Sequence, residues 1–241
     1  MPKVVTGIPI IASEMVERFK GLSVATVHEA QGRIGLMSPE IRPIKPGLKV
    51  VGRAVTVFAT PGDNVMIHVA MEQCEPGDVM VVAVNSRSDC GYFGDLLATL
   101  MQARGIAGLI IDSGVRDLAD LWGMNLPVFS RCISAQGTVK ETLGDVNVPI
   151  VCGGQLINPG DLVMGDDDGI VVVPRADLEL TAKKSEAREQ KEAGIREKYK
   201  AGVLGLDMNN LRQRLLDMGL NYVDYQAEQL KEKNQGATDD H

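Results

Sequence analysis

Three charged residues are spaced along the chain so that a folded α/β layer could bring them into one site. Asp95 follows Gly94 at the start of a helix-like segment, and Arg116 and Asp117 follow the apolar run 106–111, which is typical of a buried strand. Twenty residues separate Asp95 from Arg116, which is enough for one helix, one turn and one strand. Such a unit returns the chain to the same edge of a layer, where ligands commonly bind. We therefore expect one pocket between these two loops.

The first loop has the features of an anion site. A glycine turn that leads into a helix leaves backbone N–H groups without helical partners, and the helix dipole adds partial positive charge. The groups concerned belong to Gly94, Asp95, Leu96 and Leu97. A carboxylate or a phosphate would suit this site. The alternative is an ordinary helix start, which is common in proteins, with Asp95 as a cap or a first-turn acid.

The second loop places a cation beside a carboxylate. The guanidinium of Arg116 can hold a carboxylate or an enolate oxygen through two hydrogen bonds. Asp117 offers hard oxygen for Mg²⁺ or Mn²⁺, and Mg²⁺ keeps several waters and needs only one or two protein carboxylates. The alternative is a surface turn at Ser113 and Gly114 followed by a helix, in which Asp117 and Asp120 are first-turn acids that suit the dipole.

Other candidate residues carry weaker indications. Residues 166–168, all aspartates, lie in an evident turn, where solvated acids are commoner than metal ligands. His28 and His68 have no nearby nucleophile in the sequence, so a polar helix face or a satisfied buried histidine is expected for both. Glu192 has arginines four residues before and after it, which is typical of an exposed ion-pair ladder. A carboxylate on an arm that reaches a neighbouring chain could also complete a metal site there.

The bulk composition is ordinary for a soluble globular protein. The 241 residues are 44% hydrophobic and 24% charged, and the net charge of -7 argues against nucleic-acid binding, which needs a basic patch. No apolar run approaches the roughly eighteen residues of a membrane span, and the N-terminus has no secretory signal pattern. The four cysteines form no CxxC pair, so we expect reduced thiols and no structural zinc. A cytoplasmic protein without a membrane or nucleic-acid partner is expected.

Strands and helices alternate through most of the chain, which favours a layered α/β domain. Apolar and β-branched runs predict strands at residues 50–59, 79–84, 106–111, 127–130, 148–152, 162–164 and 170–173. Periodic patterns predict helices at residues 13–19 and 63–72, from 95 onward, and from 23 or 26 to 32. Ser13 is expected to cap the first helix, a glycine-framed turn is expected at 91–94, and a polar loop at 134–144. We place the end of this domain near Pro174.

The remaining residues, 175–241, differ in composition. Residues 176–200 form a mixed-charge helix pattern with few large apolar side chains and many i,i+4 pairs. A glycine-broken joint at 201–206 precedes a helix whose apolar face carries Met208, Leu211, Leu215 and Met218. We expect residues 175–241 to be a helical arm that docks on a neighbouring subunit and ends in a frayed tail from about 231 to 241.

The chain resembles the class II pyruvate aldolases that cleave 4-hydroxy-4-methyl-2-oxoglutarate and 4-carboxy-4-hydroxy-2-oxoadipate. Their superfamily also includes the regulators of ribonuclease E activity. Asp95, Arg116 and Asp117 fit the family pattern of an Asp, twenty residues and then Arg-Asp, and the segments GDLLA, IIDSGVRD, SRCISAQGTVKE and GDDDGIVVVP also match. The resemblance covers roughly residues 20 to 175 at superfamily level, and the C-terminal arm is similar to the aldolase branch.

The resemblance implies a β/β/α sandwich that assembles as a homotrimer or homohexamer with sites between subunits. The carboxylate of pyruvate would sit on the backbone amides of residues 94–97, and Arg116 would bind the C2 oxygen and stabilise the enolate. Asp117 would coordinate Mg²⁺ or Mn²⁺, largely through waters. Asp95 would orient one of those waters, and Glu192 would reach in from a neighbouring arm to hold others.

The implied activity is retro-aldol cleavage of a 2-oxo acid in aromatic acid breakdown, for example of protocatechuate. The products would be pyruvate plus oxaloacetate or a second pyruvate, with oxaloacetate decarboxylation as a side activity. A divalent ion with Arg116 supplies a sink for the enolate, and no lysine in either loop is placed to form a Schiff base. The main alternative is a non-catalytic protein-binding regulator resembling the ribonuclease E inhibitors, and a related lyase for another 2-oxo acid is a third reading.

Overall fold

The computed structural model describes residues 1–229, and the chain divides into two compact units. The first unit is Met1–Glu189, and the second begins at Gln190. The frayed tail predicted from about residue 231 lies outside the described residues. The division predicted near Pro174, and the docking of the arm on a neighbour, stay predictions.

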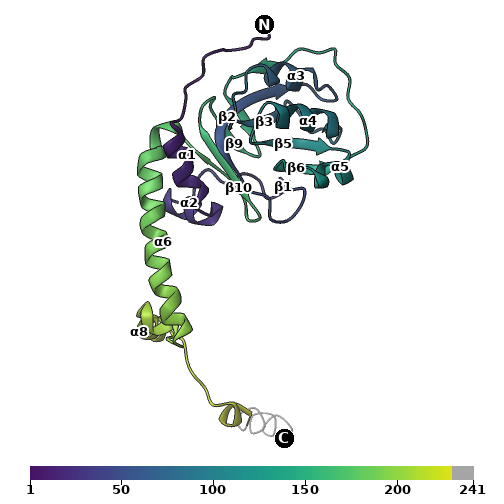
Figure 1. Ribbon diagram of the computed structural model, residues 1–241. Coiled ribbons are helices and arrows are strands. Elements are labelled where there is room, and N and C mark those ends of the chain that lie inside the picture. The colour runs from purple at the N-terminus through teal and green to yellow at the C-terminus, as the bar shows by residue number, and fades with distance from the viewer. Residues whose placement is uncertain (230–241) are drawn as a thin grey trace, which may run out of the picture. The chain divides into compact units, whose positions relative to one another are not determined.

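The first unit is built on a nine-stranded mixed sheet, in the order β1-β6-β5-β3-β2-β10-β11 (Figure 1). The central strands are parallel to one another: β2 (Val50–Ala59), β3 (Val79–Val84), β5 (Gly108–Val115) and β6 (Val128–Ile133). The sheet continues antiparallel through β10 (Leu162–Asp166), β11 (Gly169–Val173) and, at the other end, β1 (Arg42–Pro43). The near-continuous apolar runs of the central strands suit burial on both faces.

Two short strands complete this sheet. β4 (Gly91–Phe93) pairs in parallel with the end of β5, and β7 (Asp145–Val146) pairs with the end of β2. The predicted glycine-framed turn at 91–94 is therefore wrong, since Gly91–Phe93 extend the sheet and Gly94 is the cap residue of the helix that starts at Asp95. The alternative reading that placed a turn at Ser113 and Gly114 is also wrong, because β5 runs through both residues with a register irregularity between Ile111 and Gly114.

Layers of structure cover both faces of the sheet, as predicted for a β/β/α sandwich. One face packs against the helices α3 (Val65–Met71), α4 (Asp95–Ala103) and α5 (Leu118–Gly123), as Figure 1 shows. The other face packs against the hairpin of β8 (Ile150–Cys152) and β9 (Gln155–Ile157). The helices of this layer start near the edge of the sheet at which the pocket described below opens.

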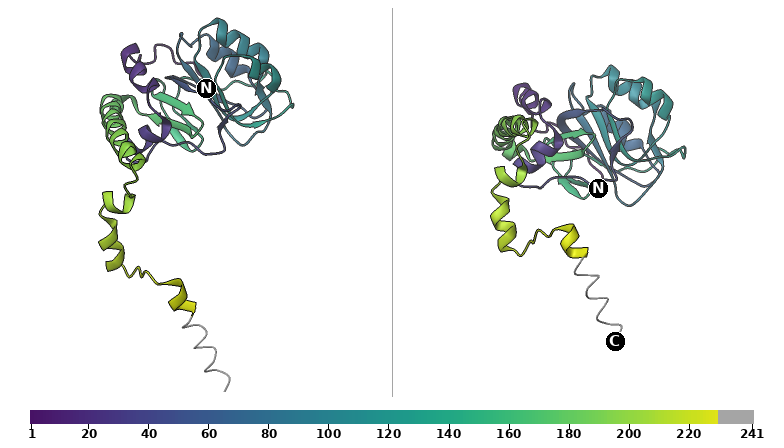
Figure 2. Two further views of the ribbon diagram at one scale, coloured as in Figure 1. Left: turned by 60° about the horizontal axis from the view of Figure 1, so that its bottom comes forward. Right: turned by 90° about the horizontal axis from the view of Figure 1, so that it is seen from below.

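A third apolar cluster joins the two ends of the first unit. Helices α1 (Ser13–Lys20) and α2 (Val24–Ala30) lie beside the first part of α6 (Leu178–Lys200), which follows the 3-10 turn η1 (Arg175–Asp177) (Figure 2). Leu178 and Ala182 are buried here with Phe19. Arg18 also forms ion pairs with α6, at 2.7 Å and 2.8 Å from two glutamates. The start of the mixed-charge helix thus contributes to the core.

Two predicted helix details differ from the structure. Ser13 is the first helical residue of α1, the cap position is Ala12, and no side chain of the described residues caps that helix. The predicted cap at Ser13 is therefore wrong, whereas Ser23 does cap α2 by accepting from the Thr26 N–H at 3.1 Å. In the second unit the predicted amphipathic helix is two helices, α7 (Gly205–Met208) and α8 (Leu211–Asp217), because Asn210 between them is left-handed.

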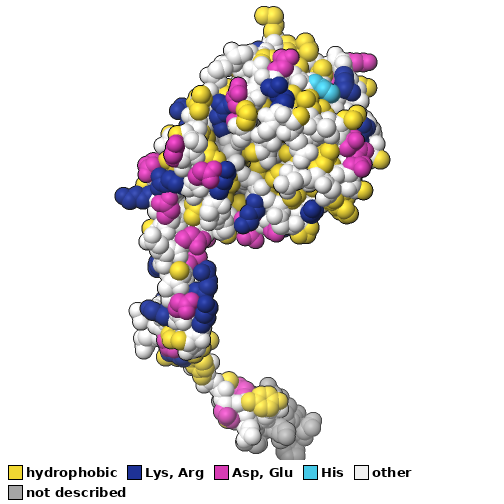
Figure 3. Space-filling view, viewed as in Figure 1, with side chains coloured by type: hydrophobic (Ala, Val, Ile, Leu, Met, Phe, Trp, Pro, Cys, Tyr) yellow, Lys and Arg dark blue, Asp and Glu magenta, His cyan; other side chains and the backbone are white. Residues whose placement is uncertain are grey.

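Charges of both signs are interspersed with apolar side chains over the face of the first unit shown in Figure 3. None of the helices within residues 1–229 is both long enough and apolar enough to cross a membrane.

Candidate functional site

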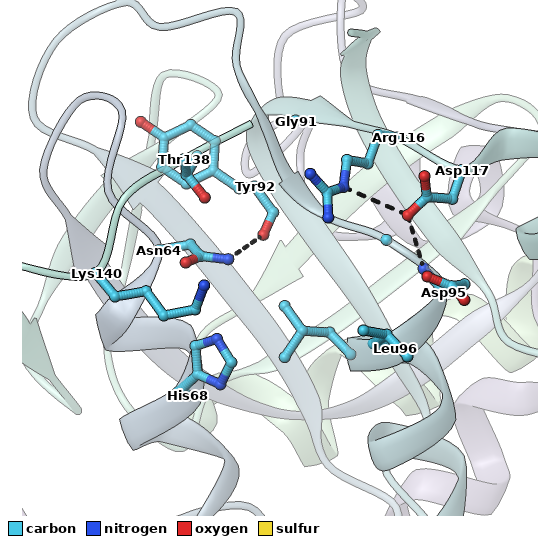
Figure 4. Close-up of a pocket in the computed structure, with 12 residues that line it drawn as sticks. Asn64, His68, Gly91, Tyr92, Asp95, Leu96, Arg116, Asp117, Thr138 and Lys140 are labelled. Atoms are coloured by element: carbon cyan, nitrogen blue, oxygen red, sulfur yellow. Dashed lines mark hydrogen bonds and ion pairs between the residues drawn. The ribbon is translucent and has the colours of Figure 1, made fainter. Parts of the chain in front are cut away.

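The two predicted loops meet at one edge of the sheet. β4 and β5 are parallel neighbours, and the N–H of Arg116 donates to the carbonyl of Phe93 at 2.9 Å. Helix α4 starts at Asp95 directly after β4, and Asp117 precedes α5 directly after β5. A cavity of about 220 Å³ opens between these elements (Figure 4). It is lined by Asn64, His68, Gly91, Tyr92, Gly94, Asp95, Leu96, Leu97, Arg116, Asp117, Thr138 and Lys140.

The first turn of α4 forms one side of the cavity. Gly94 is the cap residue, with extended backbone (φ -150°), and Asp95 is the first helical residue. The N–H groups at the start of a helix have no partner within the helix. The N–H of Asp95 donates to Asp117 Oδ2 at 3.3 Å, and those of Leu96 and Leu97 follow it in the same turn. This turn can therefore receive a carboxylate, although Asp95 also has the place of an ordinary first-turn acid.

Asp117 holds an unusual backbone conformation at the mouth of α5. Its φ of 55° and ψ of 42° are left-handed, which Asp and Asn adopt more readily than other residues with a side chain. Non-glycine residues in this region are concentrated at functional sites. Its Oδ2 accepts the Asp95 N–H and lies 3.4 Å from Arg116 Nε. The carboxylate thereby connects the two loops.

Arg116 presents its guanidinium to the cavity. The side chain is 44% exposed, and its Nε lies against Asp117. A β-carbon built on Gly137 would lie 3.3 Å from Arg116 Nη1, so the polar loop 134–144 passes close to the other end of the guanidinium. A guanidinium has five N–H donors, and one contact with Asp117 leaves donors for a ligand oxygen.

The carboxylates at this rim suit a hydrated hard cation. No group of three His, Cys, Asp or Glu side chains within residues 1–229 is arranged to hold a metal ion. Asp117 and Asp95 nevertheless lie side by side on the cavity (Figure 4). Mg²⁺ keeps several waters and is often bound through one or two carboxylates, so this donor set fits Mg²⁺ or Mn²⁺ better than zinc.

Glu192 belongs to the second unit and is not among the residues that line this cavity. Its predicted role stays a prediction.

The wall opposite Arg116 and Asp117 was not predicted. It is formed by Asn64 and His68, and by Lys140 of the loop that follows β6 (Figure 4). His68 is exposed on α3, which agrees with the prediction of a polar helix face, and it also lines the cavity. Its pKa is lowered by burial and by the positive charge of Lys140, both of which disfavour the protonated ring. No lysine lies in the two loops first considered, but a third segment brings Lys140 to the same cavity.

Asn64 supplies an unpaired acceptor to this wall. Its Nδ2 donates to the Tyr92 carbonyl at 2.8 Å, whereas its buried Oδ1 has no partner among the described residues. Buried polar atoms are normally paired, so this atom is an exception among the residues that line the cavity. The ring of Tyr92 is fixed through its hydroxyl, which accepts from the Gly62 N–H at 2.6 Å, and burial raises the pKa of this phenol. The connection after β2 starts at the same sheet edge, and that topology could have indicated Asn64.

Within the acidic run 166–168, Asp167 and Asp168 are exposed as predicted, whereas Asp166 is buried and structural. Asp166 is 8% exposed, and its two oxygens accept the N–H groups of Val24 and Asp168, both at 2.9 Å. Asp167 accepts the N–H of Gly47. The expectation of solvated acids is therefore wrong for Asp166, which fixes the start of α2 and the β10–β11 turn. All four cysteines are free thiols, and burial raises the pKa of Cys74 to about 12.

The fold and this cavity define an α/β protein of the RraA-like class. Residues 24–172 match the RraA-like family model, described as Aldolase/RraA. The chain belongs to this family, which confirms the resemblance seen in the sequence.

Individual relatives agree with this placement. A protein of Halalkalibacterium halodurans named "Putative 4-hydroxy-4-methyl-2-oxoglutarate aldolase" is 32% identical over 178 residues, which cover 73% of this chain and 84% of the relative. A crystal structure of an uncharacterized protein from Pseudomonas syringae pv. tomato matches with a TM-score of 0.70 and 32% identity, covering 81% of this chain and 96% of that one. Streptomyces coelicolor RraAS2, titled an unusual member of the RNase ES inhibitor RraA protein family, matches with a TM-score of 0.70 and 29% identity, covering 78% and 98%.

Proposed function

We propose that the protein is a divalent-metal-dependent aldolase that releases pyruvate from 4-hydroxy-2-oxo acids. The single observation that carries the proposal is the meeting of the α4 N-terminus, Arg116 and Asp117 in one cavity. The names of relatives such as the Halalkalibacterium halodurans protein support the same reaction class. The substrates proposed are 4-carboxy-4-hydroxy-2-oxoadipate and 4-hydroxy-4-methyl-2-oxoglutarate, and the proposed setting is cytoplasmic breakdown of aromatic acids such as protocatechuate.

The pyruvate portion of the substrate binds at the two loops. Its carboxylate accepts from the N–H groups of Leu96 and Leu97 at the start of α4. Arg116 donates to the C2 oxygen. When the C3–C4 bond breaks, its electron pair moves into the enolate of pyruvate, and negative charge grows on that C2 oxygen. A guanidinium already held in place by Asp117 stabilises this charge without having to reorganise.

Proton transfers complete the reaction. The C4 hydroxyl loses its proton as it becomes the carbonyl of the second product, and C3 of the enolate gains one to give pyruvate. The carboxylate of Asp95 lies on the cavity rim and orients the water that carries these protons.

Asp117 is the proposed ligand of Mg²⁺ or Mn²⁺, which when bound supplies Lewis-acid charge near the enolate oxygen. In a homotrimer or homohexamer, Glu192 of a neighbouring copy is proposed to hold further waters at this ion. The same stabilisation of an enolate would allow oxaloacetate decarboxylation as a side activity.

The opposite wall accounts for the part of the substrate beyond C4. Both proposed substrates carry a second acid group there, and Lys140 provides a positive charge on that side of the cavity. Asn64 lies on the same wall. These side chains face Arg116 across the cavity, as Figure 4 shows, so the substrate would bridge the two walls.

A second candidate function is non-catalytic regulation. The match to Streptomyces coelicolor RraAS2, whose title places it in an RNase ES inhibitor family, supports this alternative. It predicts that the chain binds a protein and does not turn over 2-oxo acids.

Pyruvate release from 4-carboxy-4-hydroxy-2-oxoadipate separates the two functions. Turnover is expected with Mg²⁺ or Mn²⁺, is expected to stop with a chelator, and should return when the metal is restored. An inhibition assay with ribonuclease E serves as the parallel test of the alternative. If no 2-oxo acid is turned over after metal addition, the aldolase proposal is overturned.

A further inference from the structure

Asp63 is a buried carboxylate that connects two segments of the cavity wall. It is 2% exposed, and its oxygens accept three backbone N–H groups. The Val65 N–H at the start of α3 donates at 2.9 Å. The N–H groups of Glu141 and Thr142 both donate to Oδ2 at 2.7 Å. One side chain therefore ties the start of α3 to a loop 78 residues further along the chain.

These hydrogen bonds compensate the buried charge. No ion pair within residues 1–229 involves Asp63. Burial acts to raise the pKa of this carboxyl, but the N–H groups of Val65, Glu141 and Thr142, together with the Thr142 side chain, outweigh it and hold the pKa below its usual range. The ionised form is the one that three N–H donors stabilise, so the connection is present at neutral pH.

The segments that Asp63 joins carry the wall opposite Arg116. Asn64 is its neighbour in sequence, and its N–H donates to the Val139 carbonyl at 3.1 Å. The Val139 N–H in turn donates to the Gly62 carbonyl at 2.9 Å. Lys140 lies between this bridge and the two N–H groups that Asp63 accepts. The backbone on both sides of Lys140 is thus fixed to the start of α3.

The pyruvate-binding loops are held by hydrogen bonds that do not involve Asp63. The Arg116 N–H donates to the Phe93 carbonyl, and the Asp117 carboxylate accepts the Asp95 N–H.

The opposite wall is joined to β4 by the Asn64 Nδ2 bond to the Tyr92 carbonyl and by the Gly91 N–H bond to the Gln136 carbonyl. A disturbance at Asp63 therefore acts first on the opposite wall and reaches the pyruvate loops only through these bonds.

From this geometry we infer that Asp63 is a positioning residue for substrate recognition. It sets where Lys140 and Asn64 stand relative to Arg116, and so controls binding of the acid group beyond C4. The inference rests on the proposed function for what the wall binds. The connection itself is a property of the chain that can be measured without turnover.

The test compares Asp63→Asn with a matched control, Asp161→Asn. Asp161 is also buried (5% exposed) and accepts the N–H groups of Asn158 and Arg175, but it does not line the cavity. Each variant has the size of the original side chain and places an amide NH₂ where an oxygen accepted an N–H. Both variants should therefore lose some stability, but only Asp63→Asn should change substrate recognition.

In steady-state kinetics with 4-carboxy-4-hydroxy-2-oxoadipate, Asp63→Asn is expected to raise KM by about tenfold. This is the effect expected when one charged contact, that of Lys140 with the acid group of the substrate, is lost. The inhibition constant of pyruvate, which occupies only the other wall, is expected to stay within about twofold. Asp161→Asn should change neither value. An unchanged KM, or an equal rise in both constants for Asp63→Asn, would overturn the inference.

Amide hydrogen exchange of the full chain gives a readout without turnover. Asp63→Asn should speed exchange at Glu141 and Thr142, while the Arg116 N–H stays protected. If the wild-type protein turns over no 2-oxo acid, the proposed function fails. The hydrogen-exchange rates at Glu141 and Thr142 still test whether Asp63 positions this loop. Unchanged exchange at Glu141 and Thr142 would contradict it.

Discussion

Asp117 Oδ2 occupies the space in which a side chain at Gly94 would begin: a β-carbon at residue 94 would lie 2.1 Å from this oxygen. Gly94 has an extended backbone (φ -150°), which any residue can adopt, so the requirement for glycine here is the close approach alone. The carboxylate can therefore reach the Asp95 N–H only because residue 94 has no side chain.

Gly94→Ala is expected to displace the Asp117 carboxylate. A shift of about 1 Å in a catalytic group can reduce the rate by about 10²-fold, and we expect a loss of that order in pyruvate release. The control is Gly123→Ala at the end of α5, where an added β-carbon meets no described atom within 4 Å. Equal activity of Gly94→Ala and the control would show that the contact is not needed.

Arg116→Ala is expected to lower kcat by about 10²–10³-fold, because one preorganised donor to a developing oxyanion is lost. The side chain is 44% exposed, so the midpoint of thermal unfolding should change little. Arg87→Ala is a matched control, since Arg87 is also paired with an acid close in sequence, at 3.7 Å, and does not line the cavity. A near-normal rate for Arg116→Ala would remove this residue from the mechanism.

Asp117→Asn is expected to weaken Mn²⁺ binding by more than about tenfold in calorimetric titration. Asn tolerates the left-handed backbone of residue 117, so the helix start should be kept while the charge is removed. Asp120→Asn, two positions into the same helix, removes an exposed carboxylate and should leave the affinity unchanged. The metal assignment is wrong if both variants bind Mn²⁺ as the wild type does.

Lys140→Gln is expected to raise the pKa of His68. Burial is the larger cause of its lowered pKa and remains, but the nearby positive charge, which disfavours protonation, is removed. An NMR titration of the imidazole should therefore show protonation at a higher pH in the variant. Only three histidines are present, so His68→Gln identifies the resonance. An unaltered titration would place Lys140 too far from His68 to act on it.

Two truncations separate the core part of α6 from the rest. Ending the chain after Pro174 removes Leu178 and Ala182 from the cluster around Phe19 and should cost about 2–5 kcal/mol or more in unfolding free energy. Ending it after Glu189 keeps those contacts and the Thr26 hydroxyl bond to Glu189, so the unfolding midpoint should be retained.

If residues beyond 189 dock on a neighbouring copy, the longer truncated chain should sediment as a smaller assembly than the full chain and lose pyruvate release. A fully active chain of unchanged size would contradict the arm prediction.

The central strands could be predicted from the sequence because their signal is local. The β-branched run at 50–59 matches β2, and the apolar run at 79–84 matches β3. The spacing of Asp95 and Arg116 also predicted correctly that their loops meet, since a helix, a turn and a strand return the chain to the same edge.

Features that depend on distant contacts could not be predicted. Ser113 and Gly114 are typical turn residues, yet they lie within β5, where Gly114 pairs with Gly91 of β4 and Cys132 of β6. Glycine fits at 114 because a β-carbon there would lie 2.6 Å from the Cys90 carbonyl oxygen. The opposite wall is placed by hydrogen bonds from a loop with no periodic pattern to Asp63, so nothing local indicated Lys140.

The bond between the Arg116 N–H and the Phe93 carbonyl has a consequence for how sequences of this fold can diverge. The strands β4 and β5 are joined through their backbones, and the anion-binding turn of α4 consists of backbone N–H groups. Substitution of the side chains at 116 and 117 leaves the strand pairing and the backbone N–H groups of the turn intact. A descendant could therefore lose the chemistry, keep the scaffold and keep an anion-binding turn, and its surface would be free to acquire a different role.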